Sequence, residues 1–383
     1  MQKDGNRLRV TARVTNTDDG FMVWSDMFER ELKDVFAVQD EISRSIADAL
    51  GAQMADATTP AADNRGTSDD VAYDFYLRGR HFFDQRGEAP LRRSLDLFRL
   101  AIQRDPRFAR AHAGIAGVHS VLPLYSRITQ DSLFAGGIAA ATRAIELDSS
   151  LAEAYASRAL LLNTRWRWAE AEQDFKRAIA LDPRYAAAHQ WYGEQLQLRN
   201  RFPEAVSLIK RASELDPVSP VIAGSYAMAL ALSRRDVEAV AQGKRAVELD
   251  SSLFVPRLIL GVAHIIGRRP NEAIKELEPA LALSGNSPLV QGMLGYAYAG
   301  AGLRPNAEAM AQQLAASGSG DAKGSLAMVQ VALGDTARAL TLFEEAARAH
   351  ASAFTVQSLW TPLLDPIRAS PRFQAVIRAV GVQ

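Results

Sequence analysis

The residues best suited to metal binding or acid–base chemistry are the six histidines, and their spacing supports neither role. They are His81, His112, His119, His189, His264 and His350. His112 and His119 lie seven residues apart, which places them on one face of a helix. Two helical turns still separate them by roughly 10 Å, too far for one metal ion. We therefore expect ordinary packing or surface histidines, and no metal site.

Sequence motifs for catalysis are absent as well. The chain has no HExxH, no phosphate-binding GxxxxGK[ST], no GxGxxG after a strand and no GxSxG. It has no cysteine, which excludes a thiol nucleophile, a disulfide and a cysteine-ligated metal. The acidic pairs at 18–19 and 69–70 fall in a predicted turn and a predicted linker, where we expect solvated charges. We predict a non-enzymatic protein that uses no cofactor.

Nucleic-acid binding has one feature in its favour, because Trp166 and Trp168 alternate with arginines as in a base-stacking surface. Two observations oppose it. Lys plus Arg and Asp plus Glu both total 44, so the chain has no net attraction for phosphate. Glu170 and Glu172 follow directly. We expect Trp168 and Trp191 to pack between helices, Trp166 to lie in a turn, and the chain to bind no nucleic acid.

The strongest pattern is a period of 34 residues. Residues 152–185 carry the markers Ala159, Ala171, Phe175, Ala178 and Pro183, and residues 186–219 carry Gly193, Ala205, Ile209, Ala212 and Pro217. Small side chains at fixed positions let two helices approach closely, and proline ends the second helix. Such markers in register are the signature of the tetratricopeptide repeat (TPR), which has two antiparallel helices per repeat.

The same markers extend over most of the chain and predict an all-α TPR superhelical solenoid of about eight helix-turn-helix repeats. The predicted repeats are 72–106, 109–149, 152–185, 186–219, 220–253, 254–287, 288–319 and one from about 320. We assign 71–357 to the array. Residues 358–383 depart from the period, and Ser370-Pro371 can begin a helix there. We therefore predict C-terminal capping helices that cover the last apolar face.

The N-terminal residues predict a small α/β element over 1–52. Apolar and polar residues alternate from 7 to 14, and 16–20 supply a turn, so 7–29 should form a β-hairpin followed by a helix over 34–51. Residues 53–70 have the composition of a linker. A lone hairpin is marginal in water and has unpaired edges. We expect either missing upstream elements or docking of the hairpin on another surface.

Two stretches resemble a known family. Residues 7–42, which include RLRVTARV and GFMVWSDMFERELKDVFAVQDEI, resemble the second half of the TolB-like α/β domain of bacterial multidomain regulators. The repeats resemble the TPR region that follows this domain, in particular YLRGR at 76–80, WRWAEAE at 166–172, HQWY at 189–192 and 364–373. In that family the region lies behind an OmpR-type winged helix, a class III nucleotide cyclase or a protein kinase. The resemblance implies a bacterial signalling regulator.

The inner face of the predicted solenoid is the candidate binding groove. The first helix of each repeat should face inward, and its inward positions change from polar in the third and fourth repeats to apolar in the fifth and sixth. The candidate partner-binding residues are Gln190, Glu194, Gln197, Met228, Leu232, Leu258, Val262, Ile265 and Ile266. The apolar residues among them form an exposed strip that would bind an apolar or helical segment. The alternative is that these side chains pack against neighbouring helices or are covered by residues 1–50.

We predict a non-enzymatic protein–protein interaction module that binds a protein or peptide in this groove and serves a bacterial signalling system. One alternative is the C-terminal part of a cyclase, kinase or winged-helix regulator; another is a self-assembling scaffold or homodimer formed through the hairpin edge. The uncharged runs 217–233 and 284–303 coincide with predicted repeat helices, so we expect no membrane span. The first twenty residues show no secretory signal. The predicted compartment is the cytoplasm, with the periplasm as the alternative.

Overall fold

The structure is a computed structural model that describes residues 2–4, 7–15, 22–31, 65–126, 128, 130–349 and 359–382. The chain divides into two compact units, Met1–Ser68 and Asp69–Gln383, and each is described by itself.

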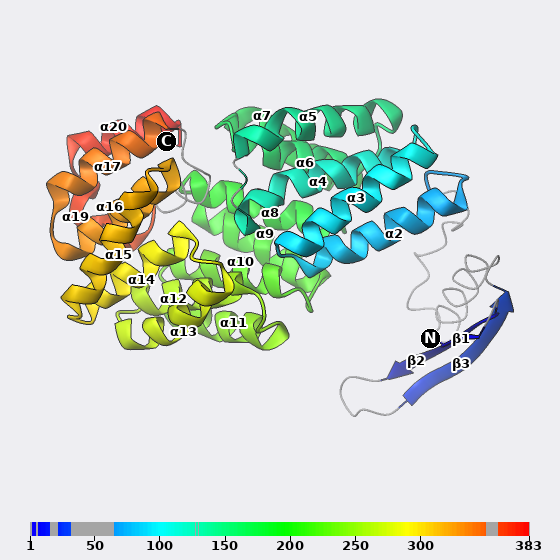
Figure 1. Cartoon of the computed structure of the whole chain (residues 1–383), viewed down its shortest axis with the longest axis horizontal. Helices are drawn as coiled ribbons and strands as arrows, with labels where there is room; N and C mark the ends of the chain where they lie inside the picture. The colour runs from blue at the N-terminus through cyan, green and yellow to red at the C-terminus, as the bar shows by residue number, and fades with distance from the viewer. Residues whose placement is uncertain are drawn as a thin grey trace. The chain divides into compact units, whose positions relative to one another are not determined.

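The first unit contains an antiparallel sheet. Its strands are β1 (Gln2–Asp4), β2 (Arg7–Thr15) and β3 (Met22–Glu31), in the order β1-β2-β3 (Figure 1). Val10 pairs with Phe28, and the register shifts once, between Val14 and Thr15. The predicted hairpin is confirmed, whereas the short strand β1 was not predicted. The predicted helix over 34–51 and most of the predicted linker lie outside the described residues.

The second unit consists of helices, and eight consecutive pairs of them match the eight predicted repeats (Figure 1). The pairs are α2 (Asp70–Gln85) with α3 (Glu88–Arg104), α4 (Ala109–Tyr125) with α5 (Gln130–Leu147), α6 (Ala152–Asn163) with α7 (Trp168–Leu181), α8 (Ala186–Leu198) with α9 (Phe202–Leu215), α10 (Pro220–Leu232) with α11 (Asp236–Leu249), α12 (Phe254–Ile266) with α13 (Pro270–Leu283), α14 (Pro288–Gly300) with α15 (Arg304–Ser317), and α16 (Gly320–Leu333) with α17 (Thr336–Arg348). We call the first helix of a pair helix A and the second helix B.

Helix A and helix B touch at the small residue that recurs along the chain. At Gly193 on α8, an added Cβ would overlap Ile209 Cγ1 and lie 3.1 Å from the carbonyl oxygen of Ala205 on α9. The equivalent residues of the neighbouring repeats, Ala159 and Ala227, are completely buried. Close contact at this position fixes which face of helix A turns away from helix B, toward the inside of the unit.

The turn between helix A and helix B also repeats. Trp166, Asn200, Arg234 and Arg268 follow one another at intervals of 34 residues, and all have a positive φ, between 57° and 61°. Residues other than Gly, Asn and Asp disfavour this left-handed conformation. The turn geometry is therefore imposed by the packing of the two helices rather than chosen by the local sequence.

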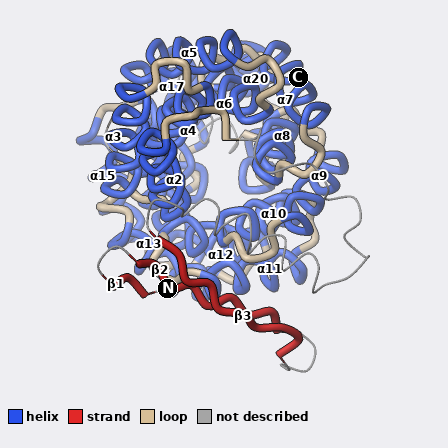
Figure 2. The backbone as a smooth tube through the Cα atoms, turned by 90° about the vertical axis from the view of Figure 1, so that its right-hand side faces the viewer, coloured by secondary structure: helices blue, strands red, loops and turns tan. Residues whose placement is uncertain are grey.

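The C-terminal segment brings distant repeats together. It comprises η4 (Pro362–Leu364), α19 (Asp365–Arg368) and α20 (Pro371–Val380). Phe373 packs on Phe343 of α17 with ring centroids 5.6 Å apart, which covers the last repeat. The indole N–H of Trp168, at the start of α7, donates to the carbonyl of Val380 over 2.8 Å. Figure 2 shows α20 beside α7, so the helical unit closes on itself.

A second contact strengthens this closure, because Trp360 Nε1 donates to the carbonyl of Leu198 at the end of α8 over 2.6 Å. Trp168, Leu198, Leu363 and Phe373 all belong to one apolar cluster, which also includes much of the fifth to eighth repeats. The two uncharged runs of the sequence form the buried helices α10 and α14. Across the described residues, no helix combines the length and apolar character needed to cross a bilayer.

Candidate functional site

The inner surface borders a partly open cavity of about 190 Å³, which we call the inner cavity. Its walls come from helix A of six successive repeats, α4, α6, α8, α10, α12 and α14. Arg86, in the turn between α2 and α3, and Thr361, just before η4, complete it. The repeat therefore positions this site, because each of these six helices turns the face opposite its helix B toward the same space.

Most of the lining is apolar. Three leucines, Leu124, Leu160 and Leu258, come from α4, α6 and α12, and Trp191 and Met228 come from α8 and α10. The remaining apolar lining residues are Val121, Leu198, Val221, Val255, Ile259, Val262, Leu289 and Met293. Several of these side chains, including Met228, are only half-buried, so an apolar ligand or side chain could gain contact area there.

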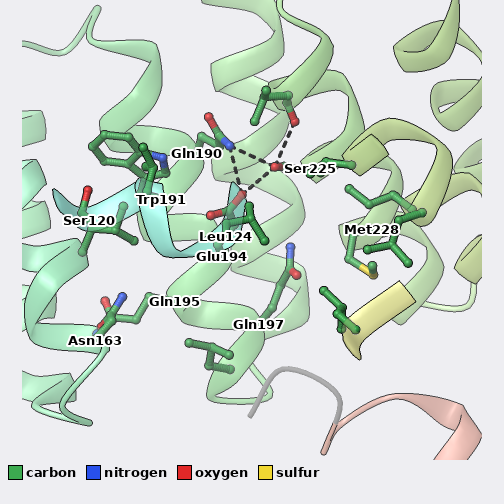
Figure 3. A pocket seen from close by; sticks show the side chains of 18 of the residues that line it. Ser120, Leu124, Asn163, Gln190, Trp191, Glu194, Gln195, Gln197, Ser225 and Met228 are labelled. Carbon is green, nitrogen blue, oxygen red and sulfur yellow. Dashed lines mark hydrogen bonds between the residues drawn. The ribbon is translucent and has the colours of Figure 1, made fainter. Parts of the chain in front are cut away.

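A hydrogen-bonded polar group centred on Glu194 interrupts the apolar wall (Figure 3). Glu194 Oε1 accepts hydrogen bonds from Gln190 Nε2 over 3.0 Å and from Ser225 Oγ over 2.5 Å. Gln190 lies one helical turn earlier on α8, and Ser225 lies on α10. Burial raises the pKa of the Glu194 carboxyl, and the bonds from Ser225 and Gln190 and the charge of Arg86 only partly oppose this.

A second polar group lies on another side of the cavity and contains Asn163 and Gln195 (Figure 3). Both side chains are nearly inaccessible, with exposed fractions of 2% and 1%. Gln195 Nε2 donates to the carbonyl of Trp168 over 2.7 Å. Gln195 Oε1, Asn163 Oδ1 and the hydroxyl of Thr361 have no hydrogen-bond partner among the described residues. Buried acceptors without donors are costly, so these atoms reduce the stability of this side of the wall.

Arg86 adds a positive charge at the edge of the cavity. Its guanidinium stacks over the ring of Phe83, 4.2 Å from the ring centroid. The Nη1 atom is buried and lacks a hydrogen-bond partner within the described part of the chain. Arg86 is the residue that ends α2, and its backbone there has a φ of 57°.

The structure brings together six of the nine residues proposed from the sequence. Gln190, Glu194, Gln197, Met228, Leu258 and Val262 line the inner cavity. Leu232, Ile265 and Ile266 do not line it and are buried, with exposed fractions of 4%, 8% and 9%. Much of the predicted apolar strip thus packs against the unit's own helices.

Sequence reasoning missed several lining residues. Ser120 and Val121 occupy in the second repeat the inward positions that were read only in the third to sixth, so the same rule would have found them. Arg86 and Thr361 carry no such signal, because one lies in a turn and the other lies beyond the array.

Two histidines have a structural explanation. His112 Nε2 lies 3.1 Å from the carbonyl oxygen of Pro106, and His189 Nε2 lies 2.9 Å from that of Pro183. Both ring nitrogens donate to the end of the preceding repeat. Within the described ranges, no three histidine, aspartate or glutamate side chains are grouped so that they could hold a metal ion.

Comparison with known proteins agrees with this architecture. Residues 167–230 match the family model described as tetratricopeptide repeat. Over 174 residues the chain is 31% identical to a protein of Rhizobium meliloti (strain 1021) named "Putative adenylate cyclase 3". That alignment covers 45% of this chain and spans only 30% of the relative's length.

Two solved structures align with this chain over most of its length. The crystal structure of the APC/C hetero-tetramer Cut9–Hcn1 aligns with a TM-score of 0.52 at 15% identity, over 81% of this chain and 54% of that one. Yeast Tom70 aligns with a TM-score of 0.45 at 17% identity, over 82% and 69%. The eight helix pairs, the repeat match and the Cut9 likeness lead to one conclusion: the helical unit of this chain is a tetratricopeptide-repeat solenoid.

Proposed function

We propose that this chain is a non-enzymatic interaction module that binds a protein or peptide on its inner surface, as the regulatory part of a bacterial signalling system. The observation that supports it best is the shared inner surface formed by helix A of six successive repeats. A preformed surface of this kind binds a partner segment with little ordering of its own backbone.

The geometry limits how a partner could bind. The inner cavity is too small for a whole helix, and several of the apolar residues beside it are buried. Half-buried side chains such as Leu124, Leu160 and Met228 remain accessible from within the unit. We therefore propose that a partner segment lies across these side chains and inserts individual apolar residues between them.

We propose a second role because part of the chain is similar in sequence to the protein named as a putative adenylate cyclase. In this role the chain is the C-terminal part of a cyclase, a kinase or a winged-helix regulator, and the N-terminal sheet belongs to a TolB-like domain. Binding on the inner surface would then regulate an output domain that precedes the repeats.

Selection of displayed peptides on the immobilised chain, followed by affinity measurement, tests the leading proposal. We compare Met228→Arg, in the inner surface, with Val237→Arg on α11, where the side chain is 83% exposed. Selected peptides should bind the wild type and the Val237 variant equally and the Met228 variant at least about tenfold more weakly. Equal loss in both variants, or no selected peptide, would contradict binding on the inner surface.

A further inference from the structure

The C-terminal segment, η4 with α19 and α20, is attached most firmly to the last repeat. Phe373 of α20 is completely buried and packs on Phe343 of α17. Arg372 pairs with Glu344 of α17 through two nitrogens, Nε over 2.8 Å and Nη2 over 3.0 Å. Apolar burial and a two-point ion pair therefore keep this segment on the last repeat.

The closure is the contact of the same segment with the third to fifth repeats, and this contact is lighter. Helix α20 packs closely along α17 but makes few close approaches to α7. Two indoles supply single hydrogen bonds to backbone carbonyls, from Trp168 to Val380 and from Trp360 to Leu198. Each such bond contributes modestly to stability, because water can replace it when the two sides separate. The closure is therefore the weaker of the two attachments.

An ion pair at the surface completes the closure. Arg234, in the turn between α10 and α11, donates from Nη2 to Asp365 of α19 over 2.6 Å. The two side chains are 63% and 48% exposed, so water and salt screen the pair and it adds little to stability. The pair is therefore a weak restraint, and its removal leaves the buried core intact.

The closed state also leaves buried polar atoms without hydrogen bonds beside the closure. Thr361 Oγ1, next to Trp360, and Gln195 Oε1 on α8 have no partner among the described residues. Gln195 is joined to this contact because its Nε2 donates to the Trp168 carbonyl. Buried polar atoms of this kind are costly, and separation of the two sides would give them access to water. The open state therefore relieves a cost that the closed state bears.

Arg368 holds residues 359–368 together as one body. Its guanidinium donates to the carbonyls of Leu359 and Thr361 over 3.1 and 2.6 Å, and it pairs with Asp365 at 3.0 Å. It also lies over the ring of Trp360, 5.9 Å from the centroid. The groups that cross the closure can therefore leave it together. Because each repeat of a solenoid contacts mainly its neighbours, a small rotation between successive repeats is enough to separate the two sides.

The closure lies at the inner surface that the proposed partner uses. Thr361 borders the inner cavity, whose other walls come mainly from helix A of six repeats. Figure 2 shows the helices of this unit arranged as a closed ring. While the closure holds, a partner segment has to enter through an end of the ring. When the closure opens, an internal stretch of a partner can enter from the side.

We infer that the closure is an autoinhibitory gate on the inner surface. In the closed state the C-terminal segment obstructs entry. In the open state the segment has moved off Trp168 and Leu198 together with the last repeats, and a partner segment binds. The inference rests on the function proposed above. Its particular consequence is that weakening the closure should strengthen partner binding, since the apparent dissociation constant falls as the open fraction rises.

Spin-label distance measurements on the full-length chain test the opening without a partner. The chain has no cysteine, so Gln173→Cys on α7 and Ala375→Cys on α20 place labels only at these two exposed positions, one on each side of the closure. We expect a main short distance and a minor longer one. One distance that is the same in the wild type and in every closure variant would overturn the gate.

Two closure variants and one matched control accompany this measurement. Trp360→Phe removes the donor to Leu198, and Arg234→Gln removes the exposed ion pair without touching the core. Each should raise the population with the longer distance about two- to fivefold. Arg235→Gln alters the adjacent arginine, which pairs with Glu238 of its own helix, and should leave the populations unchanged. Arg234→Gln keeps the test open if Trp360→Phe does not fold.

Peptides selected on the wild type connect the gate to binding. The two closure variants should bind these peptides more tightly, by the factor by which their open population rises, and the Arg235 variant should bind as the wild type does. A larger open population without tighter binding would refute the gate. A larger open population when no peptide can be selected would support the gate and count against the function proposed above, so the two failures are distinguishable.

Discussion

Single residues in the turns of this solenoid are held in a conformation that they disfavour. Asn200 suits a positive φ, but Arg234 and Arg268 at the equivalent positions do not. The next turn in the series has Gly302, with a φ of 78°. The packing of helix A on helix B therefore stabilises the strained turns, and each of them offers a site where stability can be gained.

Replacing Arg268 by glycine should stabilise the protein. The left-handed conformation costs a non-glycine residue roughly 1–2 kcal/mol, part of which is offset by the greater freedom of glycine in the unfolded chain. We expect the free energy of unfolding to rise by about 1 kcal/mol, measured by urea denaturation. Arg268→Ala is the control, because alanine retains the strain and should bring no such gain.

Glu172 is the carboxylate with the densest set of cationic partners in the described repeats. Lys176, Arg199 and Arg201 approach it to between 2.9 and 3.0 Å, and Tyr192 donates to it over 2.9 Å. Burial would raise its pKa, but the bonds from Lys176, Arg201 and Tyr192 outweigh this and hold the pKa of Glu172 at about 2. Its contribution to stability is complete above the ordinary pKa of 4.5 and is lost as the pH falls toward 2.

Acid titration of stability should reveal this network. Between about pH 4.5 and pH 2 the wild type should lose on the order of 1–2 kcal/mol more than Glu172→Gln, after allowance for screening by solvent. Chemical denaturation at a series of pH values measures the difference. Glu214→Gln, at a site 51% exposed, should follow the wild type. A constant difference between wild type and Glu172→Gln over the whole range would contradict the assignment.

At the scale of the helices, the spacing of small residues explains why these helices could be predicted from the sequence. The period of 34 depends on contacts between neighbours in sequence, such as Gly193 with Ala205 and Ile209. Local contacts leave a periodic trace in the sequence, and the repeat boundaries followed from it. The cavity was predicted in part for the same reason, since Gln190, Glu194 and Met228 occupy repeat positions. Arg86 and Thr361 join it through tertiary packing, which leaves no such trace.

Substitution of Gly193 by alanine should disrupt the contact between α8 and α9. The new Cβ would overlap Ile209 and crowd the carbonyl of Ala205, and backbone cannot yield as a side-chain end can. We expect a loss of about 1–3 kcal/mol in the free energy of unfolding, as is usual for overpacking. Gly300→Ala is the matched control, because its Cβ would meet only Pro270 at 3.5 Å. That variant should be neutral or slightly stabilising.

At the scale of the whole helical unit, the contact between Trp168 and Val380 joins the third repeat to the C-terminal helix α20. These residues are 212 positions apart in the sequence. Trp168 was expected to pack between helices, and it does so with an exposed fraction of only 5%, but against the C-terminal segment as well. The acceptor is a backbone carbonyl, which any residue supplies, so no pattern of side chains could have predicted the closure.

Replacing Trp168 by phenylalanine should loosen the closure. The variant leaves the buried carbonyl of Val380 without its donor, at a cost of about 1–3 kcal/mol. Hydrogen exchange of the amides in α20 should become faster. Trp191→Phe removes another buried indole, which lines the inner cavity instead, and serves as the control. If both variants change exchange in α20 equally, the Trp168 bond does not hold the closure.

The closure also constrains how this gene can evolve. Open repeat arrays change their copy number readily, because an added unit needs to fit only its neighbours. Here, an extra 34-residue unit between α8 and α17 would displace α20 from Trp168 and Trp360 from Leu198. Duplication or deletion of a repeat in this interval would therefore be selected against, and related chains that share the closure should share the same number of repeats.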